Sequence, residues 1–193
     1  YLMAFANSSF GTPSLVGTIG AGYKGGNDVN LSMLHQNDAF GSSLAVSSDN
    51  TRALVGAPND DGNGQDGSSD LGAVYLFSYE NQNYKTPTHE LTIGSGYKGS
   101  NDIDIGGDTQ DRLGTSVALS DDGTLLALGI ANDDGLSAAL GTNYGAVTLI
   151  EYASTDLAST TTTKKISKDY NGTGDVAVPA LAASDLFGTA VAL

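Results

Sequence analysis

The chain of 193 residues contains no cysteine, no tryptophan and only two histidines, His35 and His89. Without cysteine it can form no disulfide, no thiolate metal site and no cysteine nucleophile. Neither histidine recurs in the repeat described below or lies near a nucleophile motif, so we expect no metal or base role for them. The G-x-S-x-G and H-E-x-x-H motifs are also missing. We therefore predict no enzymatic activity; a glycosidase-type aspartate pair is the alternative.

Positive charge is scarce as well. Eight Lys and Arg residues face 22 Asp and Glu residues, which gives a net charge of −14. Nucleic-acid binding depends on neutralising phosphates, so this balance excludes it as a function. An acidic surface rich in Asp suits either solubility or Ca²⁺ binding, and both alternatives stay open. No apolar run approaches the roughly 18 residues of a membrane span.

Helical signals are missing too. No stretch shows a sustained helical period with capping residues. The chain has 26 glycines and is rich in Ser, Thr, Asn and Asp, a composition that suits short strands joined by turns. We predict an all-β protein.

Two sequence patterns recur along the chain. Residues 40–58, which begin Phe-Gly and end Gly-Ala-Pro, recur 73 positions later from Leu113 and again from Phe187. Residues 18–28 recur at 92–102 and, more weakly, at 165–175. The repeat is therefore about 74 residues long. It predicts the end of a cut unit at 1–20, full units at 21–94 and 95–167, and the start of a cut unit at 168–193.

Each full unit contains four predicted strands. In the first unit they are 43–47, 52–56, 72–79 and 90–94; in the second they are 115–120, 125–130, 145–152 and 164–167. Residues 1–5 and 15–19 correspond to the third and fourth strands of a preceding unit, and 29–33 and 103–105 are short extra strands. The variable segments 59–71, 132–143 and 153–163 are predicted loops.

Repeated four-stranded antiparallel units are typical of β-propeller blades. One blade cannot cover both of its apolar faces, so its neighbours must do so. Some two and a half units cannot close a propeller of about 4–8 blades. We therefore expect either further blades in a longer chain or completion by identical units of other chains, because exposed sheet edges invite pairing.

The motifs Phe40-Gly41 and Gly56-Ala57-Pro58, followed by Gly72-Ala73-Val74-Tyr75, resemble the FG-GAP repeat. That repeat builds the β-propeller of integrin α-subunits and occurs in large bacterial surface proteins. The second unit matches these motifs less closely, with Leu113-Gly114 and Gly129-Ile130-Ala131 in the matching places. The long unit, with Gly-Tyr-Lys-Gly after the fourth strand, is more similar to the bacterial proteins. The resemblance implies an extracellular or cell-surface location and a role in adhesion.

The sequence departs from that family at its calcium loop. The matching places, residues 48–51 and 121–123, are too short to surround an ion, so the family's Ca²⁺ ligands cannot be transferred. An acidic, glycine-rich loop follows Pro58 instead and offers enough oxygens for Ca²⁺. Its candidate ligands are Asp60, Asp61, Asn63, Asp66 and Asp70. The alternative is a turn capped by Asx side chains.

Three further features recur at fixed positions. A G-x-G-x-x-G pattern at 20–25 and 94–99 has no helix after it, so we expect a wide turn and not a dinucleotide site. The recurrent aspartates are turn caps or, alternatively, Ca²⁺ ligands. The recurrent tyrosines pack between units or, alternatively, form a surface ladder for carbohydrate. These residues are Asp28, Asp102 and Asp175, and Tyr23, Tyr97 and Tyr170.

Taken together, these features predict a non-enzymatic extracellular repeat protein. We expect part of a surface adhesin or filament that uses blade loops and edges for protein contacts or self-association. The alternative is a carbohydrate- or protein-recognition propeller module of a larger receptor.

Overall fold

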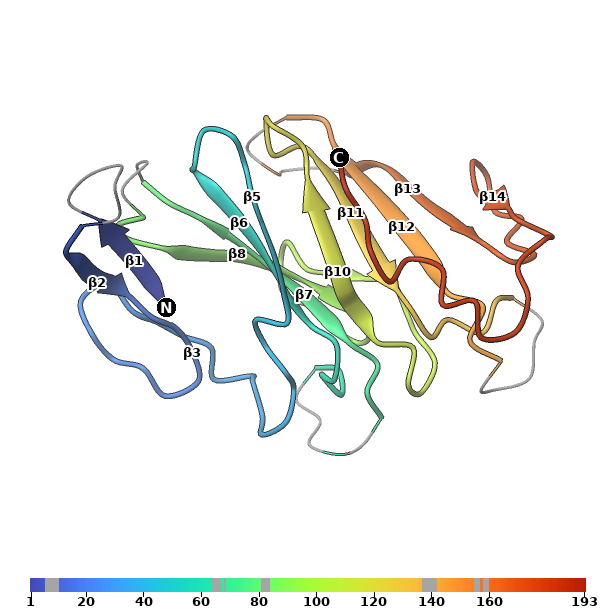
Figure 1. The fold of residues 1–193 in the computed structure, drawn as a ribbon, viewed down its shortest axis with the longest axis horizontal. Coiled ribbons are helices and arrows are strands. Elements are labelled where there is room, and N and C mark those ends of the chain that lie inside the picture. The colour runs from blue at the N-terminus through green and yellow to red at the C-terminus, as the bar shows by residue number, and fades with distance from the viewer. Residues whose placement is uncertain are drawn as a thin grey trace.

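A computed structural model describes residues 1–5, 11–63, 67, 69–80, 84–136, 142–154, 157 and 160–193. Over these residues the chain forms fourteen strands and no helix, which confirms the all-β prediction. The strands lie in successive sheets that stand side by side along the long axis of the molecule (Figure 1). No helix in this part of the chain could cross a membrane.

Each full repeat forms one five-stranded sheet with its strands in chain order. The first sheet contains β5 (Ser43–Val46), β6 (Arg52–Ala57), β7 (Ala73–Ser78), β8 (Thr88–Gly94) and β9 (Ile103–Asp104). The second contains β10 (Leu113–Leu119), β11 (Leu125–Ile130), β12 (Ala146–Tyr152), β13 (Thr160–Ser167) and β14 (Val176–Ala177). The first four strands of each sheet are antiparallel, as predicted for a blade.

A short parallel strand closes each sheet at its far edge. β9 pairs with β8, and β14 pairs with β13. The sequence predicted the extra strand at β9 but not the one at β14. Both strands lie beyond the expected unit ends at 94 and 167, so the sheets run across those boundaries; the division into units stays a prediction.

The N-terminal residues form the matching later strands of a preceding unit. β1 (Leu2–Phe5) pairs antiparallel with β2 (Pro13–Gly17), and β3 (Ile19–Gly20) pairs parallel with β4 (Val29–Asn30). The predicted strand 15–19 is thus divided at Thr18, whose amide donates to Asp28 Oδ1 at 2.8 Å.

One predicted loop is partly wrong. Strand β13 begins at Thr160, although residues 153–163 were expected to be a turn. Thr160 pairs with Tyr152 and Thr162 pairs with Glu151. Threonine is β-branched and suits a pleated strand, so the Thr-rich composition that indicated a loop extends the sheet instead.

The apolar core lies between sheets. Leu54, Leu76 and Ile93 of the first sheet share one cluster with Val117 and Leu128 of the second. The opposite face of the first sheet, with Val55, Tyr75 and Phe77, packs with Leu2 and Ile19 of the N-terminal strands. Strand β6 is consequently buried at all six positions. This arrangement confirms that neighbouring units cover each other's apolar faces.

Candidate functional site

The Phe-Gly motif of one unit joins that unit to the one before it. Leu113, in the place of Phe40, forms an isolated parallel bridge with Gly72, and Phe187 forms the same bridge with Gly145. Gly72 has φ of +85°, and a Cβ there would lie 2.2 Å from the Leu113 amide nitrogen. A side chain is therefore excluded at Gly72 both by conformation and by space.

The Gly-Ala-Pro motif receives the next unit's Phe-Gly motif. A Cβ on Gly56 would lie 2.2 Å from the carbonyl oxygen of Gly114, and one on Gly129 would lie 2.0 Å from that of Gly188. Glycine is required where two backbones approach this closely. The two halves of the repeat's signature thus meet across the boundary between units.

Hydroxyl groups complete this contact. Ser43 Oγ donates to Gly114 O at 2.8 Å, and Ser116 Oγ donates to Gly188 O at 2.7 Å. Arg52, which is buried, donates from Nη1 to Gly123 O at 2.9 Å. Sequence analysis missed these residues. The available signal was that Ser43 and Ser116 occupy equivalent places two residues after the Phe-Gly motif.

Buried polar groups meet beneath the loop that follows Pro58. Tyr75 OH donates to Asp60 Oδ2 at 2.6 Å, and Tyr97 OH lies 2.8 Å from Asp60 Oδ1. Burial, followed by the nearby Asp60 charge, raises the pKa of both tyrosines above the ordinary range. In the next unit Tyr170 OH donates to Asp133 Oδ2 at 2.9 Å. The recurrent tyrosine therefore packs beneath this loop in both full units.

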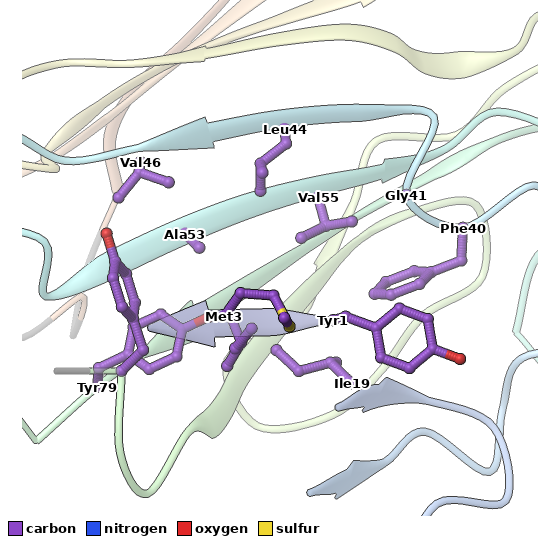
Figure 2. Close-up of a pocket in the computed structure, with 12 residues that line it drawn as sticks. Tyr1, Met3, Ile19, Phe40, Gly41, Leu44, Val46, Ala53, Val55 and Tyr79 are labelled. Carbon is purple, nitrogen blue, oxygen red and sulfur yellow. The ribbon is translucent and has the colours of Figure 1, made fainter. Parts of the chain in front are cut away.

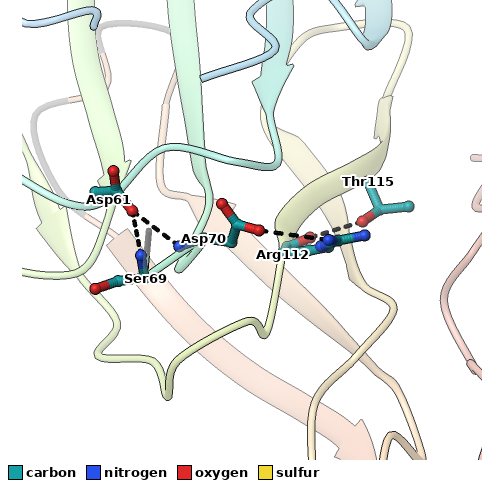
Figure 3. Close-up of polar contacts among 5 residues, drawn as sticks. All are labelled: Asp61, Ser69, Asp70, Arg112 and Thr115. Atoms are coloured by element: carbon teal, nitrogen blue, oxygen red, sulfur yellow. Dashed lines mark hydrogen bonds and ion pairs between the residues drawn. The ribbon is translucent and has the colours of Figure 1, made fainter. Parts of the chain in front are cut away.

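Asp61 holds the rest of that loop together. Its carboxylate accepts the backbone amides of Ser69 and of Asp70, the latter at 2.9 Å (Figure 3). It also accepts the backbone amide of Gly67 at 2.8 Å. Burial raises the pKa of Asp61, but these amide hydrogen bonds outweigh it and leave the pKa below its usual value. Asp70 in turn lies 3.4 Å from Arg112 Nη2, which links the loop to the next unit.

The calcium candidates are only partly brought together. Asp60 and Asp61 use their oxygens as acceptors for protein donors, and Asp70 faces Arg112. Asn63 donates its backbone N–H to Ser95 O, while Asp66 lies outside the described residues. Across the described residues no group of three acidic or histidine side chains converges. Ca²⁺ binding at this loop stays a prediction.

The carboxylates at the family's calcium position stabilise turns. Asp49 Oδ1 accepts the Thr51 amide at 2.9 Å and Ser47 Oγ at 2.7 Å. Asp122 Oδ1 accepts the Thr124 amide at 3.0 Å in the same way. These short Asx turns do not form a loop that fits an ion, in agreement with their length.

The recurrent aspartates cap wide turns. Asp102 Oδ1 accepts the Thr92 amide and Oδ2 accepts the Gly99 amide, both at 2.7 Å. Asp28 and Asp175 make the same pair of contacts in their own units. The glycine-rich patterns therefore fold back onto their strands, and no helix follows them.

A groove lies beside the N-terminal strands (Figure 2). It has a volume of about 390 Å³ and lies between β1, the β5–β6 strand pair and the residues after β7. Its walls are mostly apolar, with Met3, Phe40, Leu44 and Val55 on the sides and Tyr79 at one end. Sequence analysis did not identify this groove.

Comparison with known proteins agrees with the geometry of the signature motifs. A family model described as FG-GAP repeat matches residues 34–77, which include both halves of the first signature. No curated protein matches the chain significantly. Repeats of this kind form β-propeller-type modules, typically in extracellular proteins, and are generally non-catalytic. Residues 34–77 of the chain therefore match the FG-GAP repeat.

Proposed function

We propose that the chain is a non-enzymatic part of an extracellular adhesin or filament, similar to bacterial surface proteins. It associates with other protein units through its exposed sheet faces and edges. The observation that carries this proposal is the apolar surface at the groove, where Leu44 and Met3 are exposed. The groove lies against strand β1, which pairs with β2.

The experiment is a measurement of molar mass by light scattering over a range of concentrations of the whole chain, followed by electron microscopy. We expect association that strengthens with concentration and weakens in a Leu44→Asp variant. Leu136→Asp is the matched control, because Leu136 is also exposed but lies in a loop outside the groove. A monomer at all concentrations, or equal effects of both variants, would contradict self-association.

A second candidate function is recognition of a carbohydrate or protein as a module of a larger receptor. Two neighbouring tyrosines favour it: the Tyr1 and Tyr23 rings lie 6.4 Å apart, edge to face, and are 82% and 39% exposed. Exposed aromatic rings can stack on apolar sugar faces. Binding on a glycan array that disappears in Tyr23→Ala would support this candidate, whereas an array without hits would argue against it.

We also propose Ca²⁺ as a ligand of the loop formed by Asp60, Asp61, Asn63, Asp66 and Asp70. The support is chemical: the loop combines carboxylate and amide oxygens with glycines, which suit a hard cation. Binding requires Asp61 to exchange its amide donors for the ion, so the loop must rearrange.

A further inference from the structure

The recurrent tyrosine has different partners in the two full units. In the first unit, Tyr75 OH and Tyr97 OH lie 3.1 Å apart, and both hydroxyls contact the carboxylate of Asp60. All three residues are buried. The first unit therefore satisfies this buried carboxylate with two phenol groups of the protein itself.

The second unit does not repeat this arrangement. Thr148 stands 73 positions after Tyr75, and Asp133 stands 73 positions after Asp60. Threonine lacks the phenol ring that carries the Tyr75 hydroxyl to the carboxylate, so Asp133 keeps one tyrosine donor, Tyr170, at 2.9 Å. Thr148 is 0% exposed, and its Oγ1 has no hydrogen-bond partner among the described residues. The shorter side chain thus leaves a buried hydroxyl unpaired.

A lysine takes the place of the missing phenol. Lys165 pairs with Thr148 across β12 and β13, so the two side chains lie on the same face of the sheet. Its Nζ lies 3.5 Å from Tyr170 OH and 5.0 Å from the centre of that ring. Tyr75 OH has the corresponding place beside Tyr97 in the first unit. The second unit therefore has an ammonium group where the first has a phenol.

Asp111 brings a second unpaired oxygen to this place. It is 6% exposed, and its Oδ1 has no hydrogen-bond partner in the part of the chain that the structure describes. Burial raises the pKa of Asp111; the Asp133 charge adds to this effect and the Lys165 charge opposes it, so these groups lie within electrostatic range of Asp111. Asp111, Asp133, Thr148, Lys165 and Tyr170 thus form one polar cluster, the second-unit cluster.

We propose that the second-unit cluster is a binding site for water, which hydrogen-bonds to Asp111 Oδ1 and Thr148 Oγ1. Water can both donate and accept, and buried water typically pairs with polar groups that the protein leaves unpaired. Lys165 and Tyr170 are only half-buried, so solvent can reach the cluster from their side. Water binding here is independent of the proposed association function.

A cation fits this cluster less well than water does. The Lys165 ammonium group already supplies a positive charge beside Tyr170. Over the residues that the structure describes, no three acidic or histidine side chains converge, whereas a hard cation prefers several oxygen ligands. Neutral water satisfies both unpaired oxygens without adding charge.

Water-selective nuclear Overhauser spectroscopy of the whole chain tests the proposal at the Thr148 methyl group. Thr92 is the matched control, because it is also 0% exposed but its Oγ1 lies 3.1 Å from His89 Nε2. Both residues carry a hydroxyl proton that exchanges with water, so the comparison separates bound water from that exchange. We expect a cross-peak to water at Thr148 and its loss at Thr92. No cross-peak at Thr148, or equal cross-peaks at both, would overturn the proposal.

Replacement by valine tests whether the buried hydroxyl has a partner. Thr148→Val keeps the shape of the side chain and removes the hydroxyl. If water pairs with that hydroxyl, the variant loses a hydrogen bond and its urea midpoint falls. The control Thr92→Val loses its contact with His89 and is expected to fall as well. An unchanged or raised midpoint in Thr148→Val would indicate a hydroxyl without a partner and would overturn the proposal.

Ions give a distinct result in the same spectra. Na⁺, K⁺ and Ca²⁺ are added in turn to the whole chain, and the methyl resonances of Thr148 and Thr92 are followed. Equal, small shifts of both resonances support water as the occupant. A saturable shift confined to Thr148 would assign the second-unit cluster to a cation and overturn the proposal.

Discussion

Gly56 lacks a side chain because the carbonyl oxygen of Gly114 occupies the space. A Cβ would also lie 2.2 Å from Ser43 Oγ, in addition to the close approach to the Gly114 backbone. Backbone cannot yield as a flexible side chain can, so one added methyl group must push the two units apart.

We therefore predict that Gly56→Ala lowers the free energy of unfolding by about 2–3 kcal/mol, as overpacking does elsewhere. The matched control is Gly26→Ala, since no atom lies within 4 Å of a Cβ there. Urea denaturation of the whole chain measures both. Equal stabilities for the two variants would show that the units do not approach each other at Gly56.

The carboxyl group of Asp111 is buried, and one of its oxygens has no hydrogen-bond partner among the described residues. Its Oδ2 accepts the Asp108 amide at 2.7 Å, whereas its buried Oδ1 has no hydrogen-bond partner among the described residues. Burial, with a smaller effect from the Asp133 charge, raises the pKa of Asp111 to about 7. The folded chain therefore keeps a proton that the unfolded chain releases near pH 4.

This shift makes stability depend on pH. The contribution of Asp111 is fully present below the unfolded pKa and is lost as pH rises through about 7, because the unfolded state then binds fewer protons. We predict that Asp111→Asn reduces the fall in unfolding free energy between pH 5 and pH 8, whereas Asp121→Asn, at an exposed turn position, does not. Parallel curves for wild type and Asp111→Asn would contradict the burial of this charge.

At the scale of elements, each wide turn depends on one aspartate. Asp102 holds the amides of Thr92 and Gly99, which joins the turn to β8. We predict that Asp102→Ala lowers the unfolding free energy by about 1–3 kcal/mol, because a buried donor loses its partner. Asp121→Ala is the matched control, expected within about 0.5 kcal/mol of wild type. Chemical denaturation measures the unfolding free energies of both variants. Similar losses of unfolding free energy in Asp102→Ala and Asp121→Ala would contradict the capping role.

The loop after Pro58 gives a prediction about calcium. If the proposed site binds Ca²⁺, then ligand at a hundredfold excess over its dissociation constant stabilises the chain by about 2.7 kcal/mol. We expect a higher melting temperature with Ca²⁺ than with EDTA, and loss of the difference in Asp61→Ala. Mg²⁺ serves as the control ion. Identical melting curves with Ca²⁺ and EDTA would contradict the proposal that this loop binds Ca²⁺.

Strands were predictable where local composition determines them. The alternation at β5 and the apolar runs at β6 and β11 identified their strands and turns within a few residues. The parallel strand β14 was missed because Val176 and Ala177 form no pattern of their own and only complete a sheet edge. The sequence also could not pair Ser43 with Gly114, since those residues meet only after two units pack together.

At the scale of the whole molecule, the sheets are stacked so that each protects its neighbour's apolar face. The cluster containing Leu54 and Val117 spans two sheets, and so does the cluster containing Val55 and Leu2. The repeat pattern predicted this mutual cover. The groove was not predicted, because identical pattern positions become buried or exposed according to which units surround them.

Hydrogen exchange at equivalent strands tests this dependence on neighbours most directly. Strands β5 and β10 each pair with one partner strand, but among the described residues the strand pair of a preceding unit covers β10 and not β5. In dilute whole chain we predict that the amides of Ala118 and Leu119 exchange at least about tenfold more slowly than those of Ala45 and Val46. Equal protection of the two strands would contradict the claim that the neighbouring unit seals each face.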